Sequence, residues 1–71
     1  MSDLRYPLWQ EPVRLASIEY DPQQRREKLR SARIMVEQRY FDLQSNPDAQ
    51  DERMALRDAL NLLNVLERIN T

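Results

Sequence analysis

Two Asx-Pro dipeptides, each followed by a long stretch free of proline and glycine, constrain what this 71-residue chain can fold into. The dipeptides are Asp21-Pro22 and Asn46-Pro47. Asp and Asn are favoured helix N-cap residues, and proline is preorganised for the first helical position. Because neither following stretch contains a helix breaker, the pattern predicts two long helices that begin at the two prolines.

The two predicted helices have nearly equal lengths and a short connection. They span about 22–44 and 47–69, so each is roughly 35 Å long at 1.5 Å per residue. A connection of about two or three residues favours antiparallel packing. We therefore predict an all-α fold in which residues 21–71 form an antiparallel two-helix hairpin.

Residues 1–20 form an N-terminal arm that is rich in proline and aromatic side chains. Pro7 and Pro12 disfavour a continuous helix in its first half. The alternation of Val13 and Leu15 fits a strand, whereas Pro12 also fits the first position of a short helix. We expect an irregular arm with about one helical turn, which packs on the hairpin or extends from it.

Both predicted helices carry more apolar surface than one helix–helix contact can cover. At about 100° per residue, the first helix presents one stripe as its expected core face: Leu29, Ala32, Val36, Tyr40 and Leu43. Ile34 and Phe41 lie roughly 120–140° away from that stripe. In the second helix, Met54, Val65 and Ile69 extend an apolar face that already covers about half of the circumference. Since two facing helices bury one stripe each, another surface must cover the remainder.

The arm and a second protein surface are the two candidate covers. Trp9 is expected to anchor the arm on the hairpin, because its large apolar surface offsets the cost of ordering the segment. The other cover is a second copy, which would give a dimeric four-helix bundle, or a helix of a partner protein. Association is favoured because a core this small stabilises a fold only weakly. We therefore assign a protein-interaction role to six residues: Trp9, Ile34, Phe41, Met54, Val65 and Ile69.

The residue types that most enzymes and metal sites need are missing. The sequence contains no histidine and no cysteine, which excludes thiolate or imidazole zinc sites and the usual catalytic triads. It also contains no glycine, so a glycine-rich phosphate loop is excluded. The carboxylates at the start of the second predicted helix fit charges that complement the helix dipole. We therefore expect no catalytic residue, no metal, no cofactor and no small-molecule substrate.

A basic run over residues 25–33 is the strongest charge feature. It contains five basic residues and one acidic residue, and Arg26, Arg30 and Arg33 share one helical face. This face fits a contact with phosphates, RNA or an acidic partner. It also fits a solvated face that pairs with carboxylates of the second helix, of the arm or of Glu37. The solvated face is favoured, because the net charge is -1 and no aromatic residue is interleaved with the arginines.

The remaining features concern location. The N-terminus has no apolar targeting segment and no stretch approaches the length of a membrane span, so we expect a cytoplasmic protein without membrane contact. The sequence thus predicts a small non-enzymatic adaptor, chaperone-like protein or assembly factor that acts through apolar helix faces. The alternative is a nucleic-acid-binding hairpin that uses Arg26, Arg30 and Arg33.

Overall fold

Three helices make up the described part of the chain. The structure, a computed structural model, describes residues 4–70. Helix α1 spans Pro7–Ser17, α2 spans Pro22–Leu43 and α3 spans Gln50–Asn70, with a short 3₁₀ helix, η1, over Pro47–Ala49. No strand occurs within the described residues. The prediction of an all-α fold is therefore confirmed.

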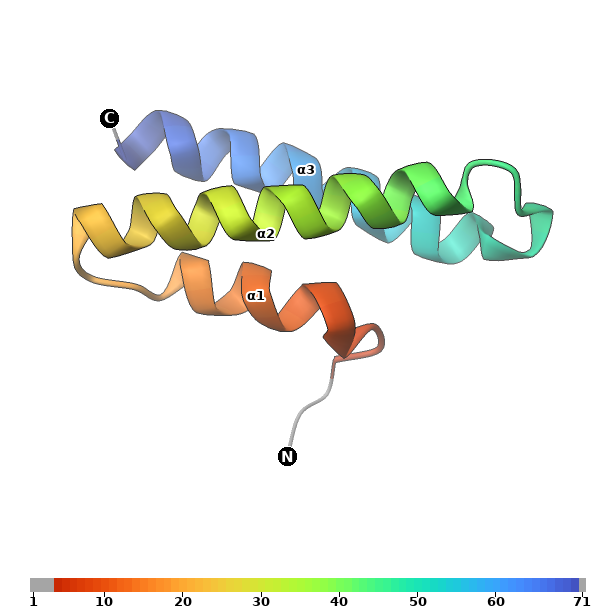
Figure 1. The fold of residues 1–71 in the computed structure, drawn as a ribbon, viewed down its shortest axis with the longest axis horizontal. Helices are drawn as coiled ribbons and strands as arrows, with labels where there is room; N and C mark the ends of the chain where they lie inside the picture. Colours follow the sequence, from red (N-terminus) through yellow and green to blue (C-terminus); the bar gives the residue numbers. More distant parts are fainter. Residues whose placement is uncertain (1–3, 71) are drawn as a thin grey trace.

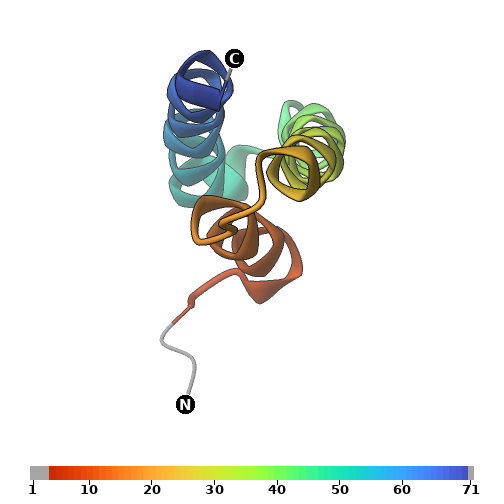
Figure 2. The same cartoon turned by 90° about the vertical axis from the view of Figure 1, so that its left-hand side faces the viewer.

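The helices are arranged around α2. Helices α2 and α3 lie side by side in opposite directions, and α1 runs back along α2 (Figure 1). Viewed along the long axis, the three helices occupy the corners of a triangle (Figure 2). Helix α1 packs mainly on α2 and makes a smaller contact with α3. The side of α3 that faces away from α2 is therefore only partly covered.

Both predicted N-caps are present. The side chain of Asp21 accepts a hydrogen bond from the backbone N–H of Gln23 at 2.9 Å. The side chain of Asn46 accepts one from the backbone N–H of Asp48 at 3.0 Å. Each cap satisfies a backbone donor that the first helical turn leaves without a partner. The second predicted helix differs only at its start, where η1 precedes α3.

Removing the first cap tests its contribution. Asp21→Ala is expected to lower the free energy of unfolding by about 1 kcal/mol, because the donors at the start of α2 lose their side-chain acceptor. Thermal unfolding followed by circular dichroism measures the loss. Gln38→Ala, an exposed position in the same helix, is the control. Equal melting temperatures for the two variants would contradict a role for the cap.

The prediction of an irregular arm is wrong, because Pro7–Ser17 form an 11-residue helix. Pro7 occupies its first turn, where a missing N–H costs nothing. The backbone N–H of Tyr6 donates to Oε1 of Gln10 at 2.7 Å, which closes the start of the helix. Pro12 lies inside the helix, where it removes one backbone hydrogen bond.

Tertiary burial explains why α1 forms in spite of Pro12. Trp9, Val13 and Ala16 follow one another at helical spacing and are all buried. Burying a large apolar side chain contributes about 1.5–3 kcal/mol, and Trp9 and Val13 lose that contribution if α1 unwinds. The expected anchoring of this segment by Trp9 is confirmed, since its side chain is only 2% exposed.

The core consists of one face from each helix. The expected stripe of α2 is buried, with Tyr40 partly buried at its edge. The buried residues of the three helices form one cluster: Trp9, Val13, Ala16, Leu29, Ala32, Val36, Leu43, Leu56, Ala59 and Leu63. This cluster contains no polar side chain.

A polar network beside the core connects all three helices. Oε2 of Glu52 in α3 accepts a hydrogen bond from Nε1 of Trp9 in α1 at 3.1 Å. The same carboxylate accepts two from Arg39 in α2, with Nε–Oε2 and Nη2–Oε1 distances of 2.8 and 3.2 Å. The Arg39 bonds, and secondarily the indole bond, hold the pKa of the Glu52 carboxyl below its ordinary value. Glu52 therefore fixes the position of α1 relative to both long helices.

Candidate protein-interaction site

Large apolar side chains remain exposed on several separate faces. The described residues of this kind are Leu8, Leu15, Ile18, Tyr20, Ile34, Phe41, Met54, Leu62, Val65 and Ile69. Single exposed apolar residues are common and need no explanation. Only residues that lie next to one another can form a continuous apolar binding surface.

Ile34 and Phe41 lie on the outer side of α2. They are seven residues apart and point roughly 120–140° away from the core face. Phe41 is 76% exposed, and its shallow surroundings are formed by Glu37, Gln38 and Asp42. Because polar side chains surround it, this pair does not belong to a continuous apolar surface.

Three residues of α3 form a continuous apolar surface, which we call the α3 strip: Leu62, Val65 and Ile69. They lie within about 60° of one another on the helix, and each is more than 40% exposed. Glu67, which binds Arg33 of α2, points in nearly the opposite direction, roughly 140–200° away. The α3 strip therefore faces away from α2.

The α3 strip continues into a groove between α1 and α3. This α1–α3 groove has a volume of about 390 Å³ and includes Leu62 of the strip. Its buried lining comes from both helices: Trp9, Val13 and Ala59. The exposed residues Arg14, which is paired with Glu11, and Asp58 also line the groove. The limited contact between α1 and α3 thus leaves an apolar groove with charged residues along it.

The six predicted interaction residues do not form one surface. Trp9 belongs to the core and is accessible only as part of the groove lining. Ile34 and Phe41 lie on α2, away from the strip. Met54 lies near η1, beside a shallow depression that also includes Gln44, Arg53 and Arg57. Only Val65 and Ile69 lie in the α3 strip, and Leu62, which was not among the predicted interaction residues, joins them.

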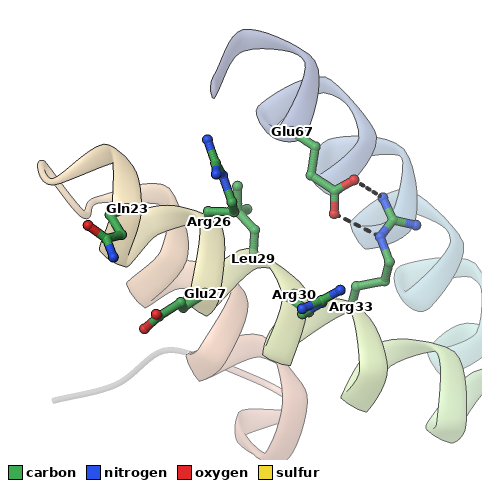
Figure 3. A pocket seen from close by; sticks show the side chains of 7 residues that line it. All are labelled: Gln23, Arg26, Glu27, Leu29, Arg30, Arg33 and Glu67. Atoms are coloured by element: carbon green, nitrogen blue, oxygen red, sulfur yellow. Dashed lines mark hydrogen bonds and ion pairs between the residues drawn. The ribbon is translucent and has the colours of Figure 1, made fainter. Parts of the chain in front are cut away.

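A second groove separates the N-terminal half of α2 from the C-terminal half of α3 (Figure 3). This arginine groove has a volume of about 620 Å³. It is lined by Gln23, Arg26, Glu27, Leu29, Arg30, Arg33 and Glu67. The structure therefore brings the three predicted arginines together along one groove.

The arginines of this groove differ in their partners. Nε and Nη2 of Arg33 donate to the two carboxylate oxygens of Glu67 at 2.8 and 2.9 Å, and these bonds raise the pKa of the Arg33 guanidinium. Elsewhere in the basic run, Lys28 forms an ion pair with Glu19. The expected pairing of the basic run with carboxylates of the second helix and the arm thus occurs at Arg33 and Lys28. Arg26 and Arg30 have no ion pair within the described residues.

Comparison with known proteins adds no identification. No protein-family model, curated protein or solved structure matches this chain. Within residues 4–70, no group of three or more acidic side chains is placed to hold a metal ion. None of the helices in this range combines the length and the apolar character that a membrane crossing requires.

Proposed function

We propose that this chain is a small non-enzymatic protein–protein interaction module that binds an amphipathic helix of a partner protein. The observation that carries the proposal is the continuity of the α3 strip with the α1–α3 groove. An exposed apolar surface that runs into a groove is typical of helix-in-groove recognition. A partner helix with apolar residues at i, i+3 and i+7 matches the strip, whose residues follow the same spacing.

An unpaired charge along the groove supports a defined orientation of the partner. Asp58 of α3 has no ion pair within the described residues, whereas Arg14 of α1 is already paired with Glu11. Complementary charges at the edge of an apolar contact fix register and orientation more than they add affinity. A partner helix with a basic residue beside its apolar face would pair with Asp58.

A partner protein is favoured over a second copy of this chain. A stable interface buries about 800 Å² on each side, so the α3 strip must be covered together with the α1–α3 groove, into which a single helix fits. A dimer through Ile34 and Phe41 would leave the α3 strip uncovered, since the two surfaces belong to different helices. Binding of a second copy to the α3 strip is therefore one of the outcomes that the Val65→Asp experiment distinguishes.

Nucleic-acid binding ranks second. It relies on Arg26, Arg30 and Arg33, but Glu67 already binds Arg33 through both carboxylate oxygens. Proteins that bind single strands combine cationic grooves with aromatic stacking platforms, and no aromatic residue lines the arginine groove. The arginine groove therefore fits the recognition of a protein better than the binding of a nucleic acid.

A charge in the α3 strip tests the proposal. Val65→Asp is expected to weaken partner binding at least about tenfold, because a buried unpaired carboxylate is costly at an apolar interface. Helicity should stay unchanged, since the Val65 side chain is 47% exposed in the free chain. The measurement is quantitative capture from native lysate, followed by titration of each captured protein against the purified chain. Ile34→Asp is the matched control, because Ile34 is 50% exposed on the opposite long helix.

The pattern of losses distinguishes the interpretations. Proteins retained by the wild type and by Ile34→Asp, but lost with Val65→Asp, support the strip as the binding surface. Sedimentation of the purified wild type as a dimer that only Val65→Asp dissociates would identify a second copy as the occupant. Identical binding by both variants would refute an interaction through α3.

A further inference from the structure

We infer that the arginine groove is a second recognition site, which binds an acidic helix of a partner protein through Arg26 and Arg30. This inference goes beyond the proposed function, because the groove lies on the α2-facing side of α3, opposite the α3 strip. The α3 strip and the arginine groove are therefore independent surfaces, and a negative result for one does not contradict the proposal for the other.

Most other basic residues in the described part of the chain already have a bonding partner, whereas Arg26 and Arg30 are unpaired arginines that line one groove together. Arg14, Lys28, Arg33 and Arg39 form ion pairs with glutamates. The guanidinium groups of two further arginines donate to backbone carbonyls, Arg25 to Glu19 and Arg53 to Gln44. Within residues 4–70, Arg26 and Arg30 take part in no such bond, and both line the same groove.

The carboxylates near the groove do not neutralise these arginines. Both oxygens of Glu67 are occupied by Arg33, so the charges of that pair balance. The side chain of Glu27 points away from α3 (Figure 3). Two positive charges thus remain without partners along a groove whose base is the buried Leu29.

The spacing of the two arginines indicates the shape of the ligand. Arg26 and Arg30 are one helical turn apart, so their side chains emerge about 6 Å from each other along α2. Two glutamates at i and i+4 on a partner helix have the same spacing. Arginine binds carboxylates through two parallel hydrogen bonds, which adds geometric specificity to the charge attraction. The aliphatic stems of the arginines can also cover apolar side chains of the partner helix.

An acidic protein segment fits this groove better than a nucleic acid. No aromatic residue lines the groove to stack against bases. Two unpaired arginines also give only a small electrostatic contribution compared with the many phosphate contacts of typical nucleic-acid binders.

A designed peptide tests the inference directly. The probe is a fluorescein-labelled, alanine-based helix of about 15 residues, which carries glutamates at i and i+4 and leucines on the adjacent positions. Fluorescence anisotropy measures its binding to the full chain. The double variant Arg26→Gln/Arg30→Gln is expected to bind this peptide about tenfold more weakly than the wild type, because two charge-assisted contacts are lost. A peptide with glutamine in place of glutamate should bind the wild type as weakly.

Matched controls make the result specific to this groove. Arg57 is also exposed and has no ion pair within the described residues, but it lies outside the arginine groove, so Arg57→Gln should bind the acidic peptide as the wild type does. The reversed variant Arg26→Glu/Arg30→Glu should instead bind a matched lysine peptide. Val65→Asp should leave acidic-peptide binding unchanged, which separates this test from that of the α3 strip.

Two results would overturn the inference. The first is equal binding of the acidic peptide by the wild type and the Arg26→Gln/Arg30→Gln variant. The second is tighter binding of a labelled single-stranded RNA oligonucleotide than of the peptide, with the same dependence on Arg26 and Arg30. That second result would assign the groove to nucleic acid.

Discussion

Replacing Trp9 by alanine is expected to leave much of the chain unfolded at room temperature. The indole is almost completely buried between α1 and the two long helices, and truncating such a side chain costs about 3–5 kcal/mol. The core of a chain this short rarely supplies more than about 3–5 kcal/mol of net stability. Urea titration followed by circular dichroism measures the loss as a shift of the unfolding midpoint.

Two further variants separate packing from hydrogen bonding. Trp9→Phe keeps most of the apolar surface but removes the donor to Glu52, so its loss should be smaller than that of Trp9→Ala. Tyr20→Ala removes an aromatic ring that is 91% exposed and should change the free energy of unfolding by less than about 0.5 kcal/mol. If Trp9→Ala unfolded at the same urea concentration as the wild type, α1 would not contribute to the core.

Replacing Glu52 by alanine is expected to lower the free energy of unfolding by about 1–3 kcal/mol at neutral pH. The change removes the acceptor of the buried Trp9 indole N–H, and a buried donor without a partner costs about that amount. It also leaves Arg39 without its carboxylate partner. Chemical denaturation at several pH values measures both the loss and its pH dependence.

The pH dependence follows from the pKa of Glu52. In the folded chain the pKa lies below the ordinary value of 4.5, chiefly because Arg39 donates to the carboxylate. A carboxyl whose folded pKa is lowered contributes stability above the unfolded pKa, and this contribution is lost as the pH falls toward the folded pKa. The difference in stability between the wild type and Glu52→Ala should therefore be largest at neutral pH and shrink below about pH 4.5.

Glu11→Ala is the control for this prediction. The pKa of Glu11 is also lowered, by hydrogen bonds from Arg14, but both side chains of this pair are well exposed to solvent. Solvent screens such pairs strongly, so this variant should differ little from the wild type at any pH. If both variants changed the pH dependence of stability equally, the net charge of the chain, rather than the network around Glu52, would determine stability at low pH.

The two long helices were predictable because their determinants are local. Asp21 and Asn46 cap the helix starts through hydrogen bonds to backbone groups two residues away, and the apolar stripe of α2 follows from its 3.6-residue period. Both signals can be read without knowledge of the tertiary structure. Each predicted helix boundary accordingly falls within a few residues of the observed one.

Helix α1 was missed because its formation depends on distant residues. Locally, Pro7 and Pro12 indicate a break, and the alternation of Val13 and Leu15 imitates a strand. The helix forms because Trp9 and Val13 are buried against the long helices, and tertiary burial overrides local propensity. The hydrogen bond from Trp9 to Glu52 connects residues 43 positions apart, which no sequence period encodes.

The exposed apolar strip of α3 was only partly predictable for the same reason. Val65 and Ile69 were correctly identified as surplus apolar residues of the second long helix. Leu62 lies between the core face and the outer face of α3, and its exposure is decided by how closely α1 approaches. The prediction that Arg26, Arg30 and Arg33 share a face needed only helical spacing, whereas the pairing of Arg33 with Glu67 depends on the packing of α3 against α2.

The position of the indole also provides a natural probe of partial opening. Trp9 is the only tryptophan in the chain, and it lies where α1 meets the other helices. Its fluorescence therefore reports the site where α1 docks, whereas circular dichroism averages over all three helices. Native proteins open in cooperative segments of unequal stability. Coincidence of the two signals during unfolding means that the chain is one cooperative unit, and an earlier fluorescence change identifies α1 as a segment that detaches while the long helices persist.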